Sequence, residues 1–438
     1  MKQIKSYSYI GVLLLALFAA SCTRTTEDLF DESAAQRINT AVKEAKELLL
    51  TSNNGWVMTY FPTESQAGAT YLVKFNSNGL AQMGTKNDYV SSYSEGEGYW
   101  DVLAESGAVL TFNSYIPIFH IYSDPSSGLG SGTGVGLGGD YEFIIMETSQ
   151  DKIILKGKKH GVYIYLTRLS DGQNWPDYFV KLEEMNNRMF NPCITELTMT
   201  VNDTLFSLTD PYTHIPAITQ EGKDPVTESV TLPFIVTDKG ILFAKTTEFA
   251  GTKLREFELS SDGNSLVCVD KDENGQTVNA KIENAASAED FFFDAADNGF
   301  RWTILSGEND MSSAVRTIYS RIEQAFAAVN TTVAQISLLY YSKNKTDAVY
   351  IENSKKAGGY LYFDKQRTAD GVAYTFRNQY DSNGRSFYTY YDGVADLMTL
   401  LNGTFRIERI SSLLNPSTLK LTDVSNPNVW FCINAKTN

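Results

Sequence analysis

The sequence predicts a mainly β, α+β protein made of antiparallel, meander-like or lipocalin-like β domains with a few amphipathic helices. Asn-Gly or Asp-Gly pairs occur ten times in the chain, and such pairs favour the positive φ angles of two-residue hairpins. Alternating apolar runs flank many of the pairs, and short strands separated by turn signals indicate antiparallel sheets. The pairs predicted to form turns include Asn78-Gly79, Asp262-Gly263, Asn274-Gly275, Asp370-Gly371 and Asn383-Gly384.

The chain opens with a predicted lipoprotein signal peptide, residues 1–21. Lys2 and Lys5 precede the apolar run IGVLLLALFAA, which is about half the length that a membrane-spanning helix needs. Small residues end the run directly before Cys22, an order that fits a signal peptide and is similar to a bacterial lipobox. We therefore expect lipid attachment at Cys22 and a lipidated tether at 22–32. A plain secreted protein with a chance cysteine is the alternative.

Helical patterns divide the rest of the chain. Residues 33–52 begin with Ser33-x-x-Gln36, a capping box, and continue with an apolar stripe at helical spacing. Further helices are predicted at 177–190, 287–297 and 310–329. The predicted domains are a helix plus antiparallel β domain at 33–170, a middle β segment at 171–285, and a helix plus β domain at 286–438.

Charge and cysteine content exclude some classes of protein. The formal net charge is −15 at pH 7, and no basic stripe offsets it, so the phosphate-neutralising surface of a nucleic-acid-binding protein is absent. After Cys22 the chain has Cys193, Cys268 and Cys432. An odd number allows at most one disulfide among them, and the alternative is that all three are small buried apolar residues.

Several motifs recur in an order that resembles a known family. ESAAQRINTAVKEAKELL, NNGWVMTYFP, YLVKFNSNG, LTFNSYIPIFHIYSDP, GGDYEFIIM and IILKGKKHG follow one another. This succession resembles the Bacteroidetes lipoproteins called domain of unknown function 4302. The resemblance extends over most of the chain and is densest from residue 22 to about 170. It implies an outer-membrane lipoprotein, cell-surface or periplasm facing, near uptake proteins of the starch-utilisation type, and it identifies neither an activity nor a ligand.

The segment GVGLGG at 134–139 matches the glycine pattern of dinucleotide-binding proteins. That pattern must follow a strand and open a helix, whereas here DYEFIIME follows, which has the composition of a strand. We therefore expect a glycine-rich loop between two strands, and no nucleotide cofactor.

One segment resembles half of a calcium loop. Asp270, Asp272 and Asn274 alternate before Gly275, as the first oxygen ligands of such a loop do. The twelfth position, where the loop needs a bidentate glutamate, is Lys281. These residues are therefore a possible calcium site, with a simple hairpin turn as the alternative. No other metal or cofactor is expected, since the three histidines, His120, His160 and His214, are far apart in sequence.

Tyrosines near the C-terminus form a possible ligand platform. Tyr380, Tyr388, Tyr390 and Tyr391 lie beside Asn and Asp residues. Aromatic rings with polar neighbours suit a glycan or peptide, because the ring face is apolar and its edge is polar. The alternative is that these aromatic residues fill a β core.

No catalytic motif stands out, and we assign no catalytic residue. The chain has no G-x-S-x-G element, and acid pairs such as Glu95/Glu97 and Glu183/Glu184 would act in glycoside hydrolysis only at a set separation in space. The leading hypothesis is a non-catalytic binding or accessory protein for polymer capture. The alternatives are an extracellular hydrolase whose carboxylates come from distant segments, and a structural or adhesive surface protein.

Overall fold

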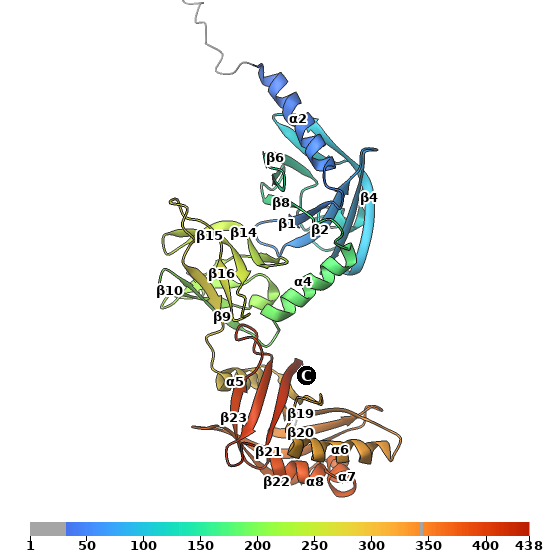
Figure 1. Cartoon of the computed structure of the whole chain (residues 1–438), viewed down its shortest axis with the longest axis vertical. Coiled ribbons are helices and arrows are strands. Elements are labelled where there is room, and N and C mark those ends of the chain that lie inside the picture. The colour runs from blue at the N-terminus through green and yellow to red at the C-terminus, as the bar shows by residue number, and fades with distance from the viewer. Residues whose placement is uncertain (1–31, 131, 133, 342–344, 438) are drawn as a thin grey trace, which may run out of the picture.

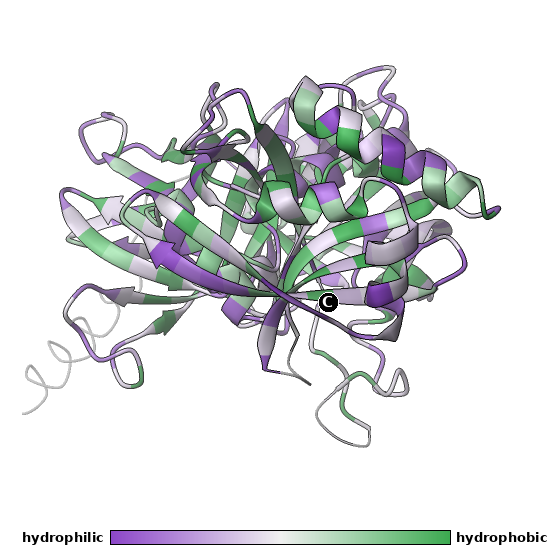
Figure 2. Cartoon of the chain, turned by 90° about the horizontal axis from the view of Figure 1, so that it is seen from below, coloured by the Kyte–Doolittle hydropathy of each residue, from purple (hydrophilic) through white to green (hydrophobic). Residues whose placement is uncertain are grey.

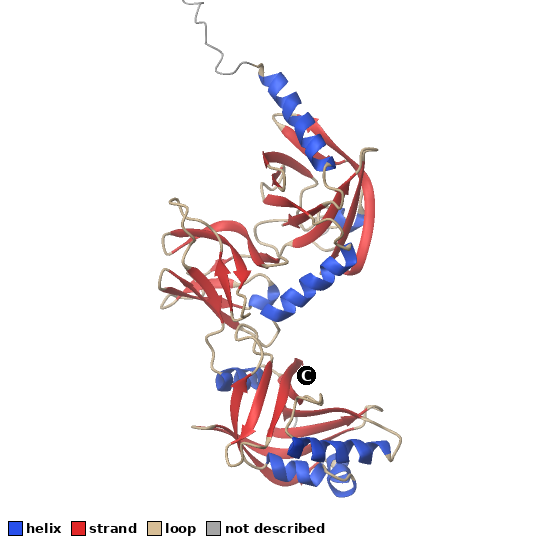
Figure 3. Cartoon of the chain, viewed as in Figure 1, coloured by secondary structure: helices blue, strands red, loops and turns tan. Residues whose placement is uncertain are grey.

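The computed structural model describes residues 32–437, apart from 131, 133 and 342–344. The protein is mainly β with antiparallel sheets, which confirms the predicted fold class. Three β units follow one another along the long axis of the molecule, and the middle sheet lies between two barrels (Figures 1 and 3). No helix among the described residues is long and apolar enough to cross a membrane.

The first unit is a closed barrel of eight strands in sequence order, because β1 pairs with both β2 and β8. Its elements are α2 (Ala34–Leu50), β1 (Trp56–Tyr60), β2 (Ala69–Phe75), β3 (Leu80–Asn87), β4 (Val90–Ala104), β5 (Ala108–Phe112), α3 (Pro117–His120), β6 (Glu142–Thr148), β7 (Lys152–Gly157) and β8 (Tyr163–Arg168). Both halves of the predicted capping box at Ser33 and Gln36 are present at the start of α2. The predicted hairpin at Asn78-Gly79 joins β2 to β3.

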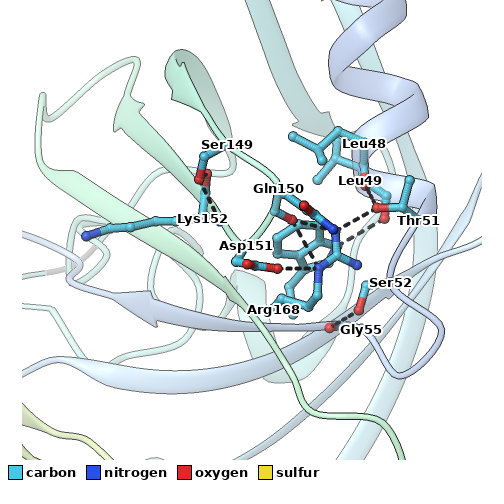
Figure 4. A network of polar contacts seen from close by, with 11 residues as sticks. Leu48, Leu49, Thr51, Ser52, Gly55, Ser149, Gln150, Asp151, Lys152 and Arg168 are labelled. Carbon is cyan, nitrogen blue, oxygen red and sulfur yellow. Dashed lines mark hydrogen bonds and ion pairs between the residues drawn. The ribbon is translucent and has the colours of Figure 1, made fainter.

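A tryptophan and an arginine join α2 to the barrel. The indole Nε1 of Trp56 donates to the carbonyl oxygen of Leu49 at 3.0 Å, satisfying one of the carbonyls that a helix end leaves open. The Arg168 guanidinium lies 4.7 Å from the Trp56 ring and donates to Gln150, Asp151 and Thr51 (Figure 4). These contacts tie the end of α2 to the seam where β8 meets β1.

The second unit is a nine-stranded sheet preceded by α4. Its elements are α4 (Trp175–Met189), β9 (Glu196–Val201), β10 (Thr204–Thr209), the 3-10 helix η2 (Pro211–Thr213), β11 (Ala217–Gln220), β12 (Val230–Thr231), β13 (Phe234–Val236), β14 (Gly240–Phe249), β15 (Thr252–Leu259), β16 (Ser265–Cys268) and β17 (Ala280–Glu283). The strand order is β12-β11-β10-β9-β17-β16-β15-β14-β13. The start of α4 packs on the first barrel through Trp175 and Phe179, and its end enters the core of the sheet through Met189.

The third unit is a second closed barrel of eight strands, β18–β25. Its elements are α5 (Ala288–Asp297), β18 (Phe300–Ile304), α6 (Ser313–Ala327), β19 (Val333–Tyr341), β20 (Thr346–Asn353), β21 (Gly358–Thr368), β22 (Gly371–Tyr380), α7 (Ser382–Tyr390), α8 (Val394–Leu401), β23 (Thr404–Arg409), β24 (Thr418–Asp423) and β25 (Trp430–Thr437). Trp302 Nε1 donates to the carbonyl of Phe292 in α5 at 3.0 Å, which repeats the contact between Trp56 and α2. Hydrophobic and hydrophilic residues alternate along many strands (Figure 2), as expected for strands with one face in a core.

One predicted hairpin turn is wrong. Asn383-Gly384 lies in the first turn of α7, where the Asp381 side chain caps the helix by accepting from the Gly384 N–H at 2.7 Å. A side chain at Gly384 would overlap the carbonyl oxygen of Tyr360. The glycine therefore permits close packing of a helix on β21, and the pair does not serve the positive φ angles of a hairpin.

The middle sheet and the second barrel share one hydrophobic core through the loop 410–417. Leu414 of this loop is fully buried in that core. The Asn415 side chain donates to the carbonyl of Asn187 at 2.6 Å and to that of Phe190 at 3.3 Å. The first barrel has a separate core.

The predicted domain boundaries fall between elements of different units. The boundary after residue 170 lies between β8 and α4, and the boundary after residue 285 lies between β17 and α5. The predicted helices at 33–52, 177–190, 287–297 and 310–329 correspond to α2, α4, α5 and α6.

Candidate functional site

The possible calcium ligands lie in a hairpin between β16 and β17. One Asp270 carboxylate oxygen accepts from the backbone N–H groups of Arg255 and Glu256, at 2.5 and 2.8 Å. Asp272 Oδ1 accepts from the backbone N–H groups of Asn274 and Gln276, at 2.9 and 2.8 Å. These carboxylates therefore serve the backbone of β15 and of the turn. Within the described part of the chain, no three His, Cys, Asp or Glu side chains are grouped as a metal site would require.

The four tyrosines of the predicted platform differ in how far they are exposed. Tyr391 is half-buried and packs on Phe326 at the edge of the core of the second barrel, with ring centroids 4.6 Å apart. Tyr380 and Tyr388 are half-buried and lie 5.4 Å apart at an interplanar angle of 32°. Tyr390 is 80% exposed. Only Tyr390 therefore presents most of its ring to solvent.

The three cysteines after the tether are free thiols, and all are buried. Burial raises the pKa of the Cys193 and Cys268 thiols to about 12. Thiols in such surroundings are poor nucleophiles at neutral pH, because the thiolate is the reactive form. Cys22 lies outside the described residues.

The side chains of both acid pairs are exposed. Glu95 accepts from Gln82 at 2.8 Å and from the Tyr93 hydroxyl at 2.5 Å on the surface of the first barrel. Glu183 forms an ion pair with Lys86 at 2.5 Å, which joins α4 to β3. The glycine-rich segment connects α3 to β6, as predicted for a loop between strands of the first unit.

A small apolar cluster of five residues, called the junction below, lies where the first barrel meets the middle sheet. These residues are Phe61, Val162, Ile235, Leu242 and Ala244. Two cavities that share Thr70 and Val236 lie beside this cluster, with volumes of about 380 and 400 Å³. Both volumes fall in the range of small-molecule sites, which often lie where two domains meet.

The smaller cavity lies between α4, β3 and the η2 segment. His214 adopts a left-handed φ of 60° and contacts the Asn186 Oδ1 through Nε2 at 2.9 Å. Burial lowers the pKa of His214, so its imidazole is neutral at neutral pH. Its ring lies 5.0 Å from that of Phe234. The imidazole is therefore held by packing and by Asn186.

The larger cavity, called the arginine cavity below, is lined by residues from both units, including Lys152 and Tyr165 of the barrel and Arg255, Glu256 and Asp270 of the sheet. Arg255 lies opposite a bulge in β14, where the pairing of β14 with β15 shifts register between Leu242 and Thr247. The bulge leaves carbonyl groups unpaired, and Arg255 donates to two of them. Its Nε donates to the Phe243 carbonyl at 2.8 Å, and its Nη2 donates to the Ala244 carbonyl at 3.2 Å.

Arg255 is only 7% exposed. The charges of Asp270 and Glu256 act on it, but neither carboxylate of these described residues forms a direct ion pair with its guanidinium. Its guanidinium carbon lies 4.3 Å from the ring centroid of Tyr165 across the junction. Burial lowers the pKa of Arg255 to about 10, so the side chain remains a cation at neutral pH. Its Nη1 donates to no described residue, and the side chain lines the arginine cavity.

Two further charged groups of the cavity have no hydrogen-bonding partner among the described residues. The Lys152 Nζ lies 4.8 Å from the ring centroid of Tyr165, on a side chain that extends away from the Arg168 contacts (Figure 4). The half-buried Glu256 carboxylate accepts no hydrogen bond from a described group. Burial raises the pKa of Glu256, and the charge of Lys152 partly opposes that shift. The arginine cavity thus offers both donors and an acceptor to a ligand.

Arg255 does not belong to any motif recognised in the sequence, although the segment TKLREFEL contains a signal for the irregular strand around it. Leu254 and Phe257 are both fully buried in one core. Residues three apart in a regular strand point to opposite faces, so this pair requires an irregularity such as a bulge. Its partners on the barrel could not be identified, because Lys152 and Tyr165 are about a hundred residues away in sequence.

The fold and the cavities define a mainly β protein of three units with ligand-sized cavities where the first two units meet. Residues 26–261 match the model of a family described as Domain of unknown function (DUF4302), and the chain belongs to this family. The matched residues include Lys152, Arg255 and Glu256 and exclude the second barrel. No curated protein matches the chain.

Three solved structures are similar to the chain at low sequence identity. The beta chain of DNA polymerase III from Streptococcus pneumoniae is 11% identical, covers 91% of this chain and 98% of its own, and has a TM-score of 0.14. A DNA polymerase sliding clamp from Caulobacter crescentus is 9% identical, with coverages of 91% and 97% and a TM-score of 0.13. DNA polymerase III subunit beta from Borrelia burgdorferi is 11% identical, with coverages of 93% and 98% and a TM-score of 0.11. These TM-scores are too low to indicate a shared function.

Proposed function

We propose that this chain is a lipid-anchored outer-membrane protein, facing the cell surface, that binds a polymeric saccharide without cleaving it. The arginine cavity is the proposed binding site. We propose that the protein acts near an uptake system of the starch-utilisation type. Charged groups of the cavity that have no hydrogen-bonding partner among the described residues support the proposal, because sugar hydroxyls both donate and accept hydrogen bonds. Arg255 and Lys152 supply donors, and Glu256 supplies an acceptor. The lipobox-like order before Cys22 supports the anchor.

The binding role is tested with the unacylated mature chain from residue 23 in a glycan-array and calorimetric screen. We expect saturable binding of at least one polysaccharide, with no release of reducing ends. Glu256→Gln should weaken that binding at least several-fold, because a neutral amide accepts more weakly than a carboxylate. Glu258→Gln, on the same strand, is the control. Release of reducing ends, or no saccharide bound, would reject the proposal.

The anchor is tested with Cys22→Ala. The variant should remain unprocessed and should carry no acyl label in cells fed an alkyne fatty acid, because acylation requires the thiol. Cys193→Ala, in which a buried thiol is removed, should label as the wild type does. Acyl labelling of Cys22→Ala at the wild-type level would refute the assignment of the lipid site.

A further inference from the structure

We propose that the arginine cavity recognises an anionic group on its saccharide, a carboxylate or a sulfate, through Arg255 and Lys152. This inference rests on the proposed function and names the chemical class of the ligand. Arg255 supplies Nη1 from the middle sheet, and Lys152 supplies Nζ from the first barrel. An anion between them would therefore contact both units at the junction.

Three other charged groups of the cavity, Arg168, Lys239 and Asp270, already have partners. Arg168 donates to Gln150, Asp151 and Thr51. Lys239 forms an ion pair with Glu258 at 3.3 Å, and the charge of the exposed Asp238 also acts on Lys239.

The Asp270 carboxylate accepts from two backbone N–H groups. The charged groups of the cavity without a hydrogen-bonding partner among the described residues are therefore Nη1 of the buried Arg255, the half-buried Glu256 carboxylate, and the exposed side chains of Lys152 and Asp238.

The burial of Arg255 favours an anionic ligand over a neutral one. The charges of Asp270 and Glu256 offset part of the cost of burying Arg255, and an anion in direct contact with the guanidinium lowers that cost further. Carbonyl groups of the bulge satisfy Nε and Nη2, whereas Nη1 is left for a ligand. An oxyanion that accepts from Nη1 and from the Lys152 ammonium forms charge-assisted hydrogen bonds, which are stronger than bonds between neutral groups. Glu256 then accepts from a neighbouring hydroxyl of the same saccharide.

The test compares matched ligands with and without one type of anionic group. The probes are oligogalacturonate with its methyl ester, and a sulfated oligosaccharide that contains no uronic acid with its desulfated form, titrated calorimetrically into the mature chain. We expect one charged probe to bind at least about tenfold more tightly than its neutral partner, the size of one charge-assisted hydrogen bond. The first pair reports on a carboxylate and the second on a sulfate.

Variants connect this preference to the cavity. Lys152→Gln should reduce the preference for the charged probe about tenfold, because loss of the ammonium weakens binding of the charged probe much more than binding of the neutral one. Lys159→Gln removes a lysine from the neighbouring turn of the same barrel and should leave the preference intact. Arg255→Gln should abolish the preference for the charged probe. Because Arg255 also holds the bulge through two hydrogen bonds, Lys152→Gln tests the same preference without changing the bulge.

Equal affinity for the charged and neutral members of both pairs would overturn this inference and leave the proposed function standing. An equal loss of preference in Lys152→Gln and Lys159→Gln would also overturn it. Failure to bind any saccharide in the wider screen would reject both.

Discussion

Trp56→Ala should lower the free energy of unfolding of the first barrel by about 3–5 kcal/mol, the usual cost of removing a large buried ring. Trp56 is completely buried, and its indole donates to the Leu49 carbonyl at the end of α2. The substitution would leave a cavity, an unpaired carbonyl group and an unstacked Arg168. Differential scanning calorimetry should show two transitions in the wild type, because the first barrel has its own core. Only the transition of the first barrel should shift.

Two variants separate the contributions of Trp56. Trp56→Phe keeps most of the ring and removes the hydrogen bond, so it should cost about 1–3 kcal/mol, the penalty for leaving a buried polar group unpaired. Trp302→Ala removes the equivalent contact with α5 and should shift the other transition. A shift of both transitions in Trp56→Ala would contradict the separation of the cores.

Leu414→Ala should lower the free energy of unfolding of the joined middle sheet and second barrel by about 2–5 kcal/mol. Leu414 is fully buried in the core that these two units share. The loop also brings Asn415, whose side chain donates to carbonyl groups at the end of α4. The same calorimetric experiment checks this prediction, and here the transition of the first barrel should stay in place.

The adjacent residue offers a matched control. Leu413 is 45% exposed, so Leu413→Ala should change the free energy of unfolding by no more than about 0.5 kcal/mol, as most surface substitutions do. Equal effects of the two substitutions would show that the loop is not part of the shared core.

Local sequence patterns predicted the elements whose causes are local. The Ser33 and Gln36 capping box lies within one turn of helix, and the Asn78-Gly79 turn connects adjacent strands, so each can be recognised from a few residues. Asn383-Gly384 shows where this fails. The pair forms part of a helix because Asp381 caps that helix and because β21 requires a glycine against it. The contact with β21 is a tertiary one, which the turn motif does not encode.

The candidate site depends still more on tertiary contacts. The Asp270, Asp272 and Asn274 pattern was visible because the alternating oxygens of a turn also resemble part of a calcium loop. In the structure these oxygens bind backbone N–H groups. The arginine cavity instead combines β7 and β8 of the barrel with β15 of the sheet. An irregularity near Arg255 could have been inferred from the spacing of Leu254 and Phe257. The contact of Arg255 with Tyr165 across the junction could not.

Closure of the two barrels affects how the protein can associate with its neighbours. A strand with free N–H and C=O groups can pair with a strand of another molecule and so promote aggregation. Among the described sheets only the middle one has free edges, and these are the short strands β12 and β13. Pro233 lies between them and has no N–H to donate. This chain should therefore resist the addition of a strand from a neighbouring molecule.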